Sequence, residues 1–428
     1  MQRAQRVTDL WSVALTRPTR HTLLARVCFV AFAARCLCVL LINPEPAWDG
    51  IIYERAAEQL AHGEGYTQRI LDASAPARAT AFFPPGFPAV LSVLHRVAHG
   101  RQLDLWFQIA MSLLLVPAAW LFGRRLGGVR AGRIAAWLTA LWPGGVLLSA
   151  SWFTEPLFAV LLSAALLIIL YARRRDRKRA LLGAALLLGL AAYVRPTALA
   201  IVPFTGAAVG YLSQRAGGRL ERWRAASIWA GLAIGMACLP LSPWIVRNQI
   251  ELHAPVLVST NAGFNLLLGT VGEGSYGPLP ESVDCPGGVP EVERDRCRLS
   301  HAFARIRQDP TIWLARDVLK ALHTFGHESA PAQLLANATD LRAERWSLLA
   351  LALTRAFWLP FIALALLGGF YAWGQPGRRD ALRLLLTPVA GTLLLHSVFI
   401  GGDRYHVPLV PIFAALAGYC ATRLWKRS

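Results

Sequence analysis

The chain has 428 residues, of which 55% are hydrophobic and only 16% are charged. A soluble domain usually carries about a quarter charged residues, so the composition excludes an ordinary soluble enzyme. The net charge of +19, from 44 basic and 25 acidic residues, falls mainly in short clusters between apolar runs. Such clusters are typical of the cytoplasmic loops of a membrane protein and do not favour a nucleic-acid partner.

Apolar runs that are long enough to cross a bilayer as helices recur along the chain. With the basic clusters placed inside, they predict an all-α integral membrane protein with about ten (nine to twelve) transmembrane helices. The N-terminal segment, with Arg3 and Arg6, is expected inside, ahead of a signal anchor. The expected spans are residues 23–42, 104–122, 131–148, 152–171, 181–194, 197–212, 227–246, 347–373, 382–400 and 407–424.

Two loops, 44–103 and 247–346, are expected on the outer side and divide the chain into three parts. Residues 1–246 are predicted to be a transmembrane catalytic module whose first outer loop, 44–103, bears interfacial helices. Residues 247–346 are predicted to form a larger extracytoplasmic loop subdomain, and residues 347–428 the C-terminal transmembrane helices.

Within these loops, the apolar run 85–97 is too short to span and is expected to lie along the outer interface or to re-enter the membrane from that side. A helix that begins at Pro310 alternates apolar and charged residues, which predicts an amphipathic helix on the membrane surface. His327 and Glu328, further along the same loop, are interpreted as an ordinary loop pair.

The seven cysteines divide by this topology. Cys285 and Cys297 both fall in the large outer loop, where a disulfide is favoured if that face is oxidising. A zinc site is less favoured, because no CxxC motif or histidine pair accompanies them. The other five lie in apolar runs, where a free cysteine behaves as a small hydrophobe. These are Cys28, Cys36, Cys38, Cys238 and Cys420.

Ionisable residues at the ends of the predicted spans map to the outer face. The notable ones are Asp49, Glu155, Arg195, Arg247 and Arg404. Such residues are costly at membrane depth and are functional candidates by default. Because the planar arginine fork suits phosphate oxygens, the pattern predicts a site for an anionic, membrane-tethered substrate with a carboxylate poised for proton transfer.

Each of these residues also has a purely structural interpretation. Asp49 can cap the helix that follows it, since aspartate is a favoured N-cap residue. Glu155 can be a charge in the cap region of its helix. Arg195 and Arg404 can be interface arginines whose side chains extend to the water.

Several short motifs follow one another in order along the chain. In the first outer loop they are Trp48-Asp49, Tyr53-Glu54, Gly63-Glu64-Gly65-Tyr66 and Phe83-Pro84-Pro85-Gly86-Phe87-Pro88. Later ones are Thr154-Glu155-Pro156-Leu157-Phe158, Tyr193-Val194-Arg195-Pro196-Thr197, Pro243-Trp244 with Arg247-Asn248, and Arg404-Tyr405. Together they resemble the C-type membrane glycosyltransferases, in particular the protein O-mannosyltransferase and lipid A aminoarabinose transferase branch.

The resemblance implies an inverting transferase that moves a sugar from a polyprenyl-phosphate carrier to an acceptor on the extracytoplasmic face. By position, Asp49 matches the general base, and Glu155 matches an acidic residue that orients the acceptor or contacts a metal. The residues implied in substrate or phosphate binding are Arg195, Arg247, Arg404, Tyr405 and Tyr53. The implied enzyme is a polyprenyl-phosphate-sugar-dependent hexosyl- or pentosyltransferase.

No cofactor is implied with certainty, and a divalent metal is not favoured, because Gly50 follows Asp49 where some relatives carry a second acid. The expected partners are a polyprenyl-phosphate-linked sugar, a glycan, lipid or protein acceptor, and membrane lipids. The composition, rich in Ala, Arg and Leu, favours a bacterial inner membrane with the site facing the periplasm. The alternative is a flippase or transporter of lipid-linked sugars, for which ionisable residues near the bilayer midplane and an internal repeat are expected.

Overall fold

The computed structural model describes residues 20–98, 100–214, 217–336 and 341–425. The basic N-terminal residues Arg3 and Arg6 and the Lys426-Arg427 tail lie outside the described residues. Within the described ranges the chain is almost entirely helical and has no β-strand. An isolated antiparallel bridge joins Thr67 to Ala79. The predicted fold class, an all-α integral membrane protein, is confirmed.

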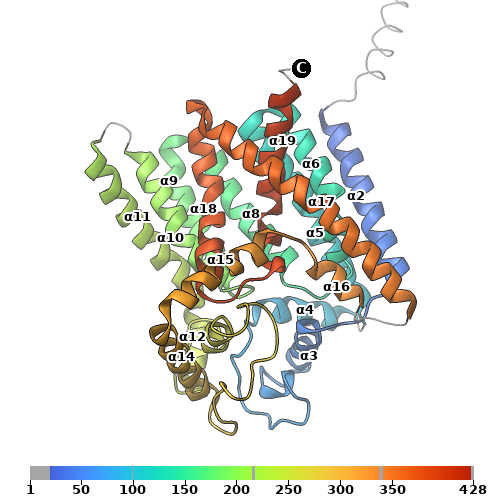
Figure 1. Ribbon diagram of the computed structural model, residues 1–428, viewed down its shortest axis with the longest axis vertical. Helices are drawn as coiled ribbons and strands as arrows, with labels where there is room; N and C mark the ends of the chain where they lie inside the picture. Colours follow the sequence, from blue (N-terminus) through green and yellow to red (C-terminus); the bar gives the residue numbers. More distant parts are fainter. Residues whose placement is uncertain (1–19, 99, 215–216, 337–340, 426–428) are drawn as a thin grey trace, which may run out of the picture.

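The long helices lie side by side in the upper part of Figure 1 and form a bundle. Six helices of the described chain are long and apolar enough to cross a membrane, and two shorter apolar helices accompany them. The total of about ten spans therefore stays a prediction. The bundle helices are α2 (Arg20–Ile42), α5 (Gln102–Gly127), α8 (Glu155–Tyr171), α9 (Arg177–Ala192), α10 (Thr197–Ser213), α11 (Arg219–Cys238), α17 (Leu341–Trp373), α18 (Pro376–Val398) and α19 (Val410–Trp425).

The predicted span 131–148 is not a single helix. It consists of α6 (Val129–Ala140) and the short α7 (Pro143–Leu148). The residue before a proline is pushed out of the helical region, and Trp142 accordingly has an extended backbone with ψ of 112°. The apolar composition runs through this break, which is why a prediction from hydropathy joins the two helices.

A buried arginine holds the broken end of α6. Arg35 of α2 is fully buried, and its Nη1 donates to the carbonyl of Ala140 at 3.2 Å. Its Nε donates to Ser112 Oγ at 2.8 Å, and that hydroxyl donates to the Gly145 carbonyl at 2.9 Å. The cation therefore lies where the free carbonyls of a helix C-terminus carry partial negative charge.

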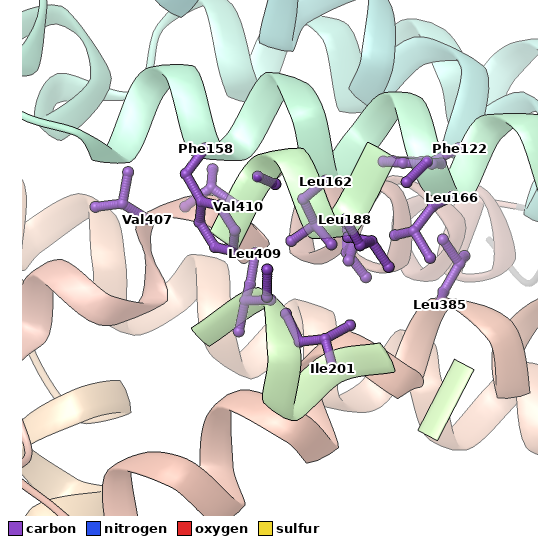
Figure 2. Close-up of a cluster of buried hydrophobic side chains, with 14 of the residues drawn as sticks. Phe122, Phe158, Leu162, Leu166, Leu188, Ile201, Leu385, Val407, Leu409 and Val410 are labelled. Carbon is purple, nitrogen blue, oxygen red and sulfur yellow. The ribbon is translucent and has the colours of Figure 1, made fainter. Parts of the chain in front are cut away.

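The centre of the bundle is a continuous apolar core (Figure 2). It packs α8 against α9, α10, α18 and the short 3-10 helix η4 (Asp403–Leu409). The residues labelled in the figure are Phe122, Phe158, Leu162, Leu166, Leu188, Ile201, Leu385, Val407, Leu409 and Val410. This packing fixes the relative positions of α8, α9, α10 and η4, and the candidate site lies at one end of these helices.

Close contact between α10 and α11 depends on two glycines. A Cβ at Gly206 or Gly210 would collide with the backbone of α11, at Trp229 and at Ala225 respectively. The spacing of four residues is the small-residue pattern that lets membrane helices approach closely.

The extramembrane helices gather at one end of the bundle, below it in Figure 1. From the first outer loop come α3 (Asp49–His62) and α4 (Gly86–Val97). α12 (Ser242–Glu251) continues α11 within one candidate span, Arg219–Glu251. Beyond it are α13 (Ala262–Leu268), α14 (Glu291–Gln308), α15 (Pro310–Phe325) and α16 (Ala330–Ala336). The predicted division into residues 1–246, 247–346 and 347–428 stays a prediction.

The first outer loop and the larger one are tied together by one carboxylate. Glu291, the first residue of α14, accepts from Thr80 Oγ1 at 2.5 Å and from the Ala81 amide at 2.9 Å. It also accepts from Thr260 Oγ1 at 2.5 Å. Charge-assisted hydrogen bonds of this kind are stronger than neutral ones, so Glu291 joins the two loops into one body.

The Gly- and Pro-rich part of the larger loop is fastened to α14. Cys285 and Cys297, the pair for which the sequence favours a disulfide, form one with Cα atoms 6.2 Å apart. Beside it, Asp284 accepts from Arg298 at 2.6 Å and from Arg294 at 2.8 Å. The hydrogen bond from Arg298 holds the pKa of Asp284 at about 2, so this carboxylate stays ionised at neutral pH.

We predict that Arg35→Met destabilises the protein by about 1–3 kcal/mol, because the Ala140 carbonyl and Ser112 lose a buried donor. The expected result is a lower midpoint of thermal unfolding for the purified protein in detergent. Arg26→Met, at an exposed position of the same helix, is the matched control. Equal midpoints for the two variants would contradict the capping role of Arg35.

Candidate active site

A cleft of about 630 Å³ opens where the bundle meets the extramembrane helices. Its walls come from the start of α3, the first outer loop, the start of α10, α13, the end of α18 and η4. Eight of the polar or ionisable side chains that line it are suited to binding or to proton transfer. They are Asp49, Tyr53, Thr154, Arg195, Tyr276, His396, Arg404 and Tyr405.

Asp49 is the first residue of α3. The N-cap position belongs to Trp48, and no side-chain cap bond is formed there, so Asp49 does not cap the helix as one interpretation of the sequence held. Instead its Oδ2 accepts from Arg404 Nη1 at 2.6 Å. Gly50 follows because a Cβ at this position would lie 3.1 Å from the Cβ of Trp152.

The backbone just before Asp49 is strained. Trp48 has a φ of 54°, a left-handed value that is uncommon for a bulky residue. Such conformations cost about 1–3 kcal/mol and persist where the surroundings over-determine them, as at functional sites.

A second carboxylate, Glu155, lies behind the cleft wall. It begins α8 and is fully buried, and its Oε1 accepts from Arg195 Nη1 at 2.5 Å. Arg195 also donates to Thr154 Oγ1 at 2.8 Å. The Nε of Arg404 lies 3.8 Å from the same Oε1. Glu155 therefore holds both arginines, and the site contains two carboxylates and two guanidinium groups.

Arg195 and Arg404 each have N–H groups beyond those that bind Asp49, Glu155 and Thr154. Their hydrogen bonds to Asp49, Glu155 and Thr154 use only Nη1 of each guanidinium group, which has five N–H donors. The buried Nε of Arg404 has no hydrogen-bond partner among the described residues. Oriented donors with spare N–H groups are suited to an anion such as phosphate.

Three aromatic rings surround the Arg404 guanidinium group. Its central carbon lies 4.8 Å from the ring centre of Tyr276, 5.6 Å from that of Tyr405 and 5.8 Å from that of Phe153. A cation within about 6 Å of an aromatic ring centre is attracted by the ring. The three rings therefore help to hold the guanidinium group in the cleft.

Tyr53 brings a protonated hydroxyl to the same cleft. Its ring is buried and meets the rings of Phe83 and Phe87 edge to face. Burial, with a smaller contribution from the Asp49 carboxylate, raises the pKa of Tyr53 well above its usual range. The hydroxyl therefore stays protonated at any physiological pH and can donate a hydrogen bond.

Arg247, the remaining arginine predicted for the site, is used elsewhere. Its Nη1 donates to the Thr80 carbonyl at 2.8 Å and its Nη2 to the Tyr66 carbonyl at 2.9 Å. The guanidinium group also lies 4.8 Å from the ring centre of Trp244. Arg247 thus joins α12 to the first outer loop, and it does not line the cleft that Arg195 and Arg404 share.

Glu328 is not part of an ordinary loop pair, which corrects that interpretation of the sequence. It is fully buried, accepts from Trp142 Nε1 at 2.9 Å, and lies 3.3 Å from His406 Nε2. His406 Nδ1 lies 2.6 Å from the Thr324 carbonyl, which can only accept, so Nδ1 carries a proton. Burial raises the pKa of Glu328. The pair holds His406 in one orientation, two residues after Arg404.

The residue before Arg404 is fixed as well. Asp403 Oδ2 accepts from the Ser329 amide, from Ser329 Oγ at 2.7 Å and from the Ala330 amide at 2.7 Å. Anchors at Asp403 and His406 flank Arg404 and hold η4 against the loop before α16. No short-range motif predicts them, because their partners lie more than 70 residues away in the sequence.

The chain is similar to known proteins in part of its sequence and in its fold. Residues 83–246 match the model of the family described as dolichyl-phosphate-mannose-protein mannosyltransferase. No curated protein sequence matches the chain. Among solved structures, the apo oligosaccharyltransferase of Archaeoglobus fulgidus superposes with a TM-score of 0.53 and 14% identity, over 96% of this chain and 51% of that chain.

Two further structures resemble the chain. AglB from Archaeoglobus fulgidus, in complex with an inhibitory peptide and a dolichol-phosphate, has a TM-score of 0.51 and 14% identity, over 95% of this chain and 50% of that one. ArnT from Cupriavidus metallidurans, bound to undecaprenyl phosphate, has a TM-score of 0.42 and 14% identity, over 92% of this chain and 76% of that chain.

The predicted resemblance to the protein O-mannosyltransferase branch is confirmed over residues 83–246, which match that family's model. At these identities the likeness to the archaeal structures shows the fold alone. The chain spans about half the length of those structures.

We predict that Glu328→Ala lowers the stability by about 1–3 kcal/mol, because the indole N–H of Trp142 and the ring of His406 lose their buried partner. Thermal unfolding of the purified protein measures the effect. Glu281→Ala, at an exposed position of the same outer loop, is the control. A variant as stable as this control would show that the buried network contributes little.

Proposed function

We propose that the protein is an inverting glycosyltransferase that moves a sugar from a polyprenyl-phosphate carrier to an acceptor on the outer face of the membrane. The observation that carries the proposal is the polar end of the cleft, where the carboxylate of Asp49 and the guanidinium groups of Arg195 and Arg404 meet. A lipid-linked donor needs cations for its phosphate and an apolar surface for its chain.

The cleft offers both kinds of surface. Beside the arginines its wall is apolar, with Leu199 at the outer end of α10 and Leu395 and Phe399 at the outer end of α18. A phosphate held by the arginines therefore leaves a route for an apolar chain toward the bundle helices. The matched family is described by a dolichyl-phosphate-mannose donor, and the archaeal AglB structure of the same fold contains a dolichol-phosphate; both support this class of donor.

In the proposed reaction Asp49 takes the proton of an acceptor hydroxyl. The acceptor oxygen attacks the anomeric carbon from the face opposite the phosphate, and the bond from that carbon to the phosphate oxygen breaks. The electron pair stays on the phosphate, so the configuration at the anomeric carbon inverts. No group has to protonate the leaving phosphate, which is stable as an anion.

Charge moves in step with this displacement. Before the reaction Arg404 pairs with the Asp49 carboxylate. As Asp49 takes the proton its charge is neutralised, while the phosphate changes from a diester with one negative charge to a monoester that carries more. Arg404 is thereby released to the leaving phosphate, where charge develops in the transition state.

Glu155 acts in this proposal as a positioning residue. It is fully buried behind the wall and bound to Arg195, which supports holding that arginine rather than orienting the acceptor. Tyr53 and Tyr405 line the same end of the cleft, where their hydroxyl groups can bind the substrate. No step of the proposal requires a metal.

The sugar is a hexose or a pentose, and the acceptor is a glycan, a lipid or a protein, whose contacts are expected in the outer loops. In a bacterial inner membrane this face would be the periplasmic one. A flippase of lipid-linked sugars would bind the same donor and leave its glycosidic bond intact, so release of the free carrier phosphate separates the two functions.

We predict that Asp49→Asn lowers the release of free polyprenyl phosphate by about 10²–10⁴-fold, the usual contribution of a general base. Purified protein receives a panel of undecaprenyl-phosphate sugars together with an extract of envelope acceptors. Glu64→Gln, exposed in the same loop, is the control. Equal release by wild type and Asp49→Asn would remove Asp49 as the base. If the wild type binds a donor but releases no phosphate from it, the flippase hypothesis is favoured.

We further predict that Arg195→Lys and Arg404→Lys each reduce the rate of transfer by at least about tenfold, because lysine keeps the charge but loses the planar fork. The loss is expected in kcat more than in KM. Arg247→Lys, outside the cleft, is expected to lower thermal stability with a smaller effect on kcat. A larger kcat loss for Arg247→Lys than for the other two would contradict this assignment of the phosphate site.

A further inference from the structure

We infer that His396 accepts a hydrogen bond from a hydroxyl group of the donor sugar and thereby contributes to the choice of sugar. The inference rests on the proposed function and extends it to specificity. His396 lies in the last turn of α18, lines the cleft and is only 6% exposed.

The protonation of the ring follows from its neighbours. His396 Nδ1 lies 2.9 Å from the Ile400 carbonyl oxygen. A carbonyl oxygen can only accept, so Nδ1 carries the proton and donates it. In the neutral ring Nε2 is then a bare acceptor, and it has no hydrogen-bond partner among the described residues.

The orientation of the ring is fixed by stacking. Its centre lies 3.7 Å from that of Tyr405, and the two planes are 16° apart. The Arg195 guanidinium carbon lies 5.2 Å from the centre of the same Tyr405 ring. His396 and Arg195 therefore both contact Tyr405 and both line the cleft, so we place the sugar of a donor whose phosphate Arg195 binds beside His396.

The chemistry of the cleft indicates which ligand group His396 takes. Arg195, Arg404 and the tyrosine hydroxyl groups are donors, which suit the phosphate. A sugar hydroxyl also needs an acceptor. The Asp49 carboxylate is already bound to Arg404 and assigned to the acceptor substrate, whereas His396 Nε2, like the amide oxygens of Asn261 and Asn265, lies among the residues that line the cleft. A buried acceptor without a partner is unfavourable, and a sugar hydroxyl that donates to Nε2 removes this penalty.

A site built to bind a substrate hydroxyl rejects the analogue that lacks it. The test therefore compares undecaprenyl-phosphate mannose, glucose and galactose with their single-deoxy analogues. The variants are His396→Phe, which keeps a ring able to stack on Tyr405 but has no acceptor, and His396→Gln, which restores one. His62→Phe, exposed on α3, is the control, and thermal unfolding checks that each variant is folded.

For a donor that the wild type uses, His396→Phe is expected to lower kcat/KM by about tenfold or more, and His396→Gln to recover part of the loss. With the wild type, the single-deoxy donor that lacks the recognised hydroxyl should show a kcat/KM lower by a similar factor than the full donor. With His396→Phe, removing that hydroxyl should cause no further loss of kcat/KM. Equilibrium binding of the same donors should show the same non-additivity, which makes the test independent of turnover.

The role of His396 would be overturned if the loss caused by His396→Phe and the loss caused by removing a hydroxyl were independent at every deoxy position, in both rate and binding. If the wild type still releases carrier phosphate in that case, the proposed function stands. If the wild type releases none from any donor, the proposed function fails, and the binding comparison still decides whether His396 recognises a sugar hydroxyl.

Discussion

Two guanidinium groups, Arg195 and Arg404, are held between two carboxylates, Asp49 and Glu155, at the end of the helical bundle next to α3 and α4. Charges this poorly exposed to water are costly unless they are paired in good geometry, and removing one partner leaves another charge uncompensated. The four residues come from α3, α8, the turn between α9 and α10, and η4. Their mutual pairing therefore requires these elements to meet at one place, and the apolar core of Figure 2 fixes α8, α9 and η4 relative to one another.

The position of Arg404 depends on residues far from the cleft. Arg35 holds the broken end of α6, and the break exposes the indole of Trp142 to Glu328. Glu328 in turn lies against His406, two residues after Arg404. Each contact alone is a modest contribution. The contacts of Trp142, Glu328 and His406 thus link the segment before α7 to η4, beside Arg404.

Much of the site was predictable because the relevant residues stand at the ends of predicted spans on one face, and topology alone brings such residues to the same depth. Asp49, Glu155, Arg195 and Arg404 follow this rule. Arg247 also stands at the end of a predicted span, but it donates its hydrogen bonds to backbone carbonyls of the first outer loop. No local sequence pattern predicts these partners.

Other parts of the site leave no signal in the sequence. Glu328 pairs with Trp142 across 186 residues of sequence, beyond any periodic pattern. In the sequence His396 is one polar residue in an apolar span, and only the contacts of its two nitrogens reveal its chemistry.

The left-handed backbone of Trp48 places stability and activity in opposition at one position. Glycine adopts this φ without a steric penalty, so a Trp48→Gly chain would relieve the strain and also lose the indole that lines the cleft. The backbone just before Asp49 would become more flexible, although the proposed reaction needs the Asp49 carboxylate in one fixed orientation. Selection for a more stable chain would favour that change, whereas selection for an accurately placed carboxylate would oppose it. Thermostabilising engineering of this protein should therefore leave the residue before Asp49 unchanged, even though its backbone is strained.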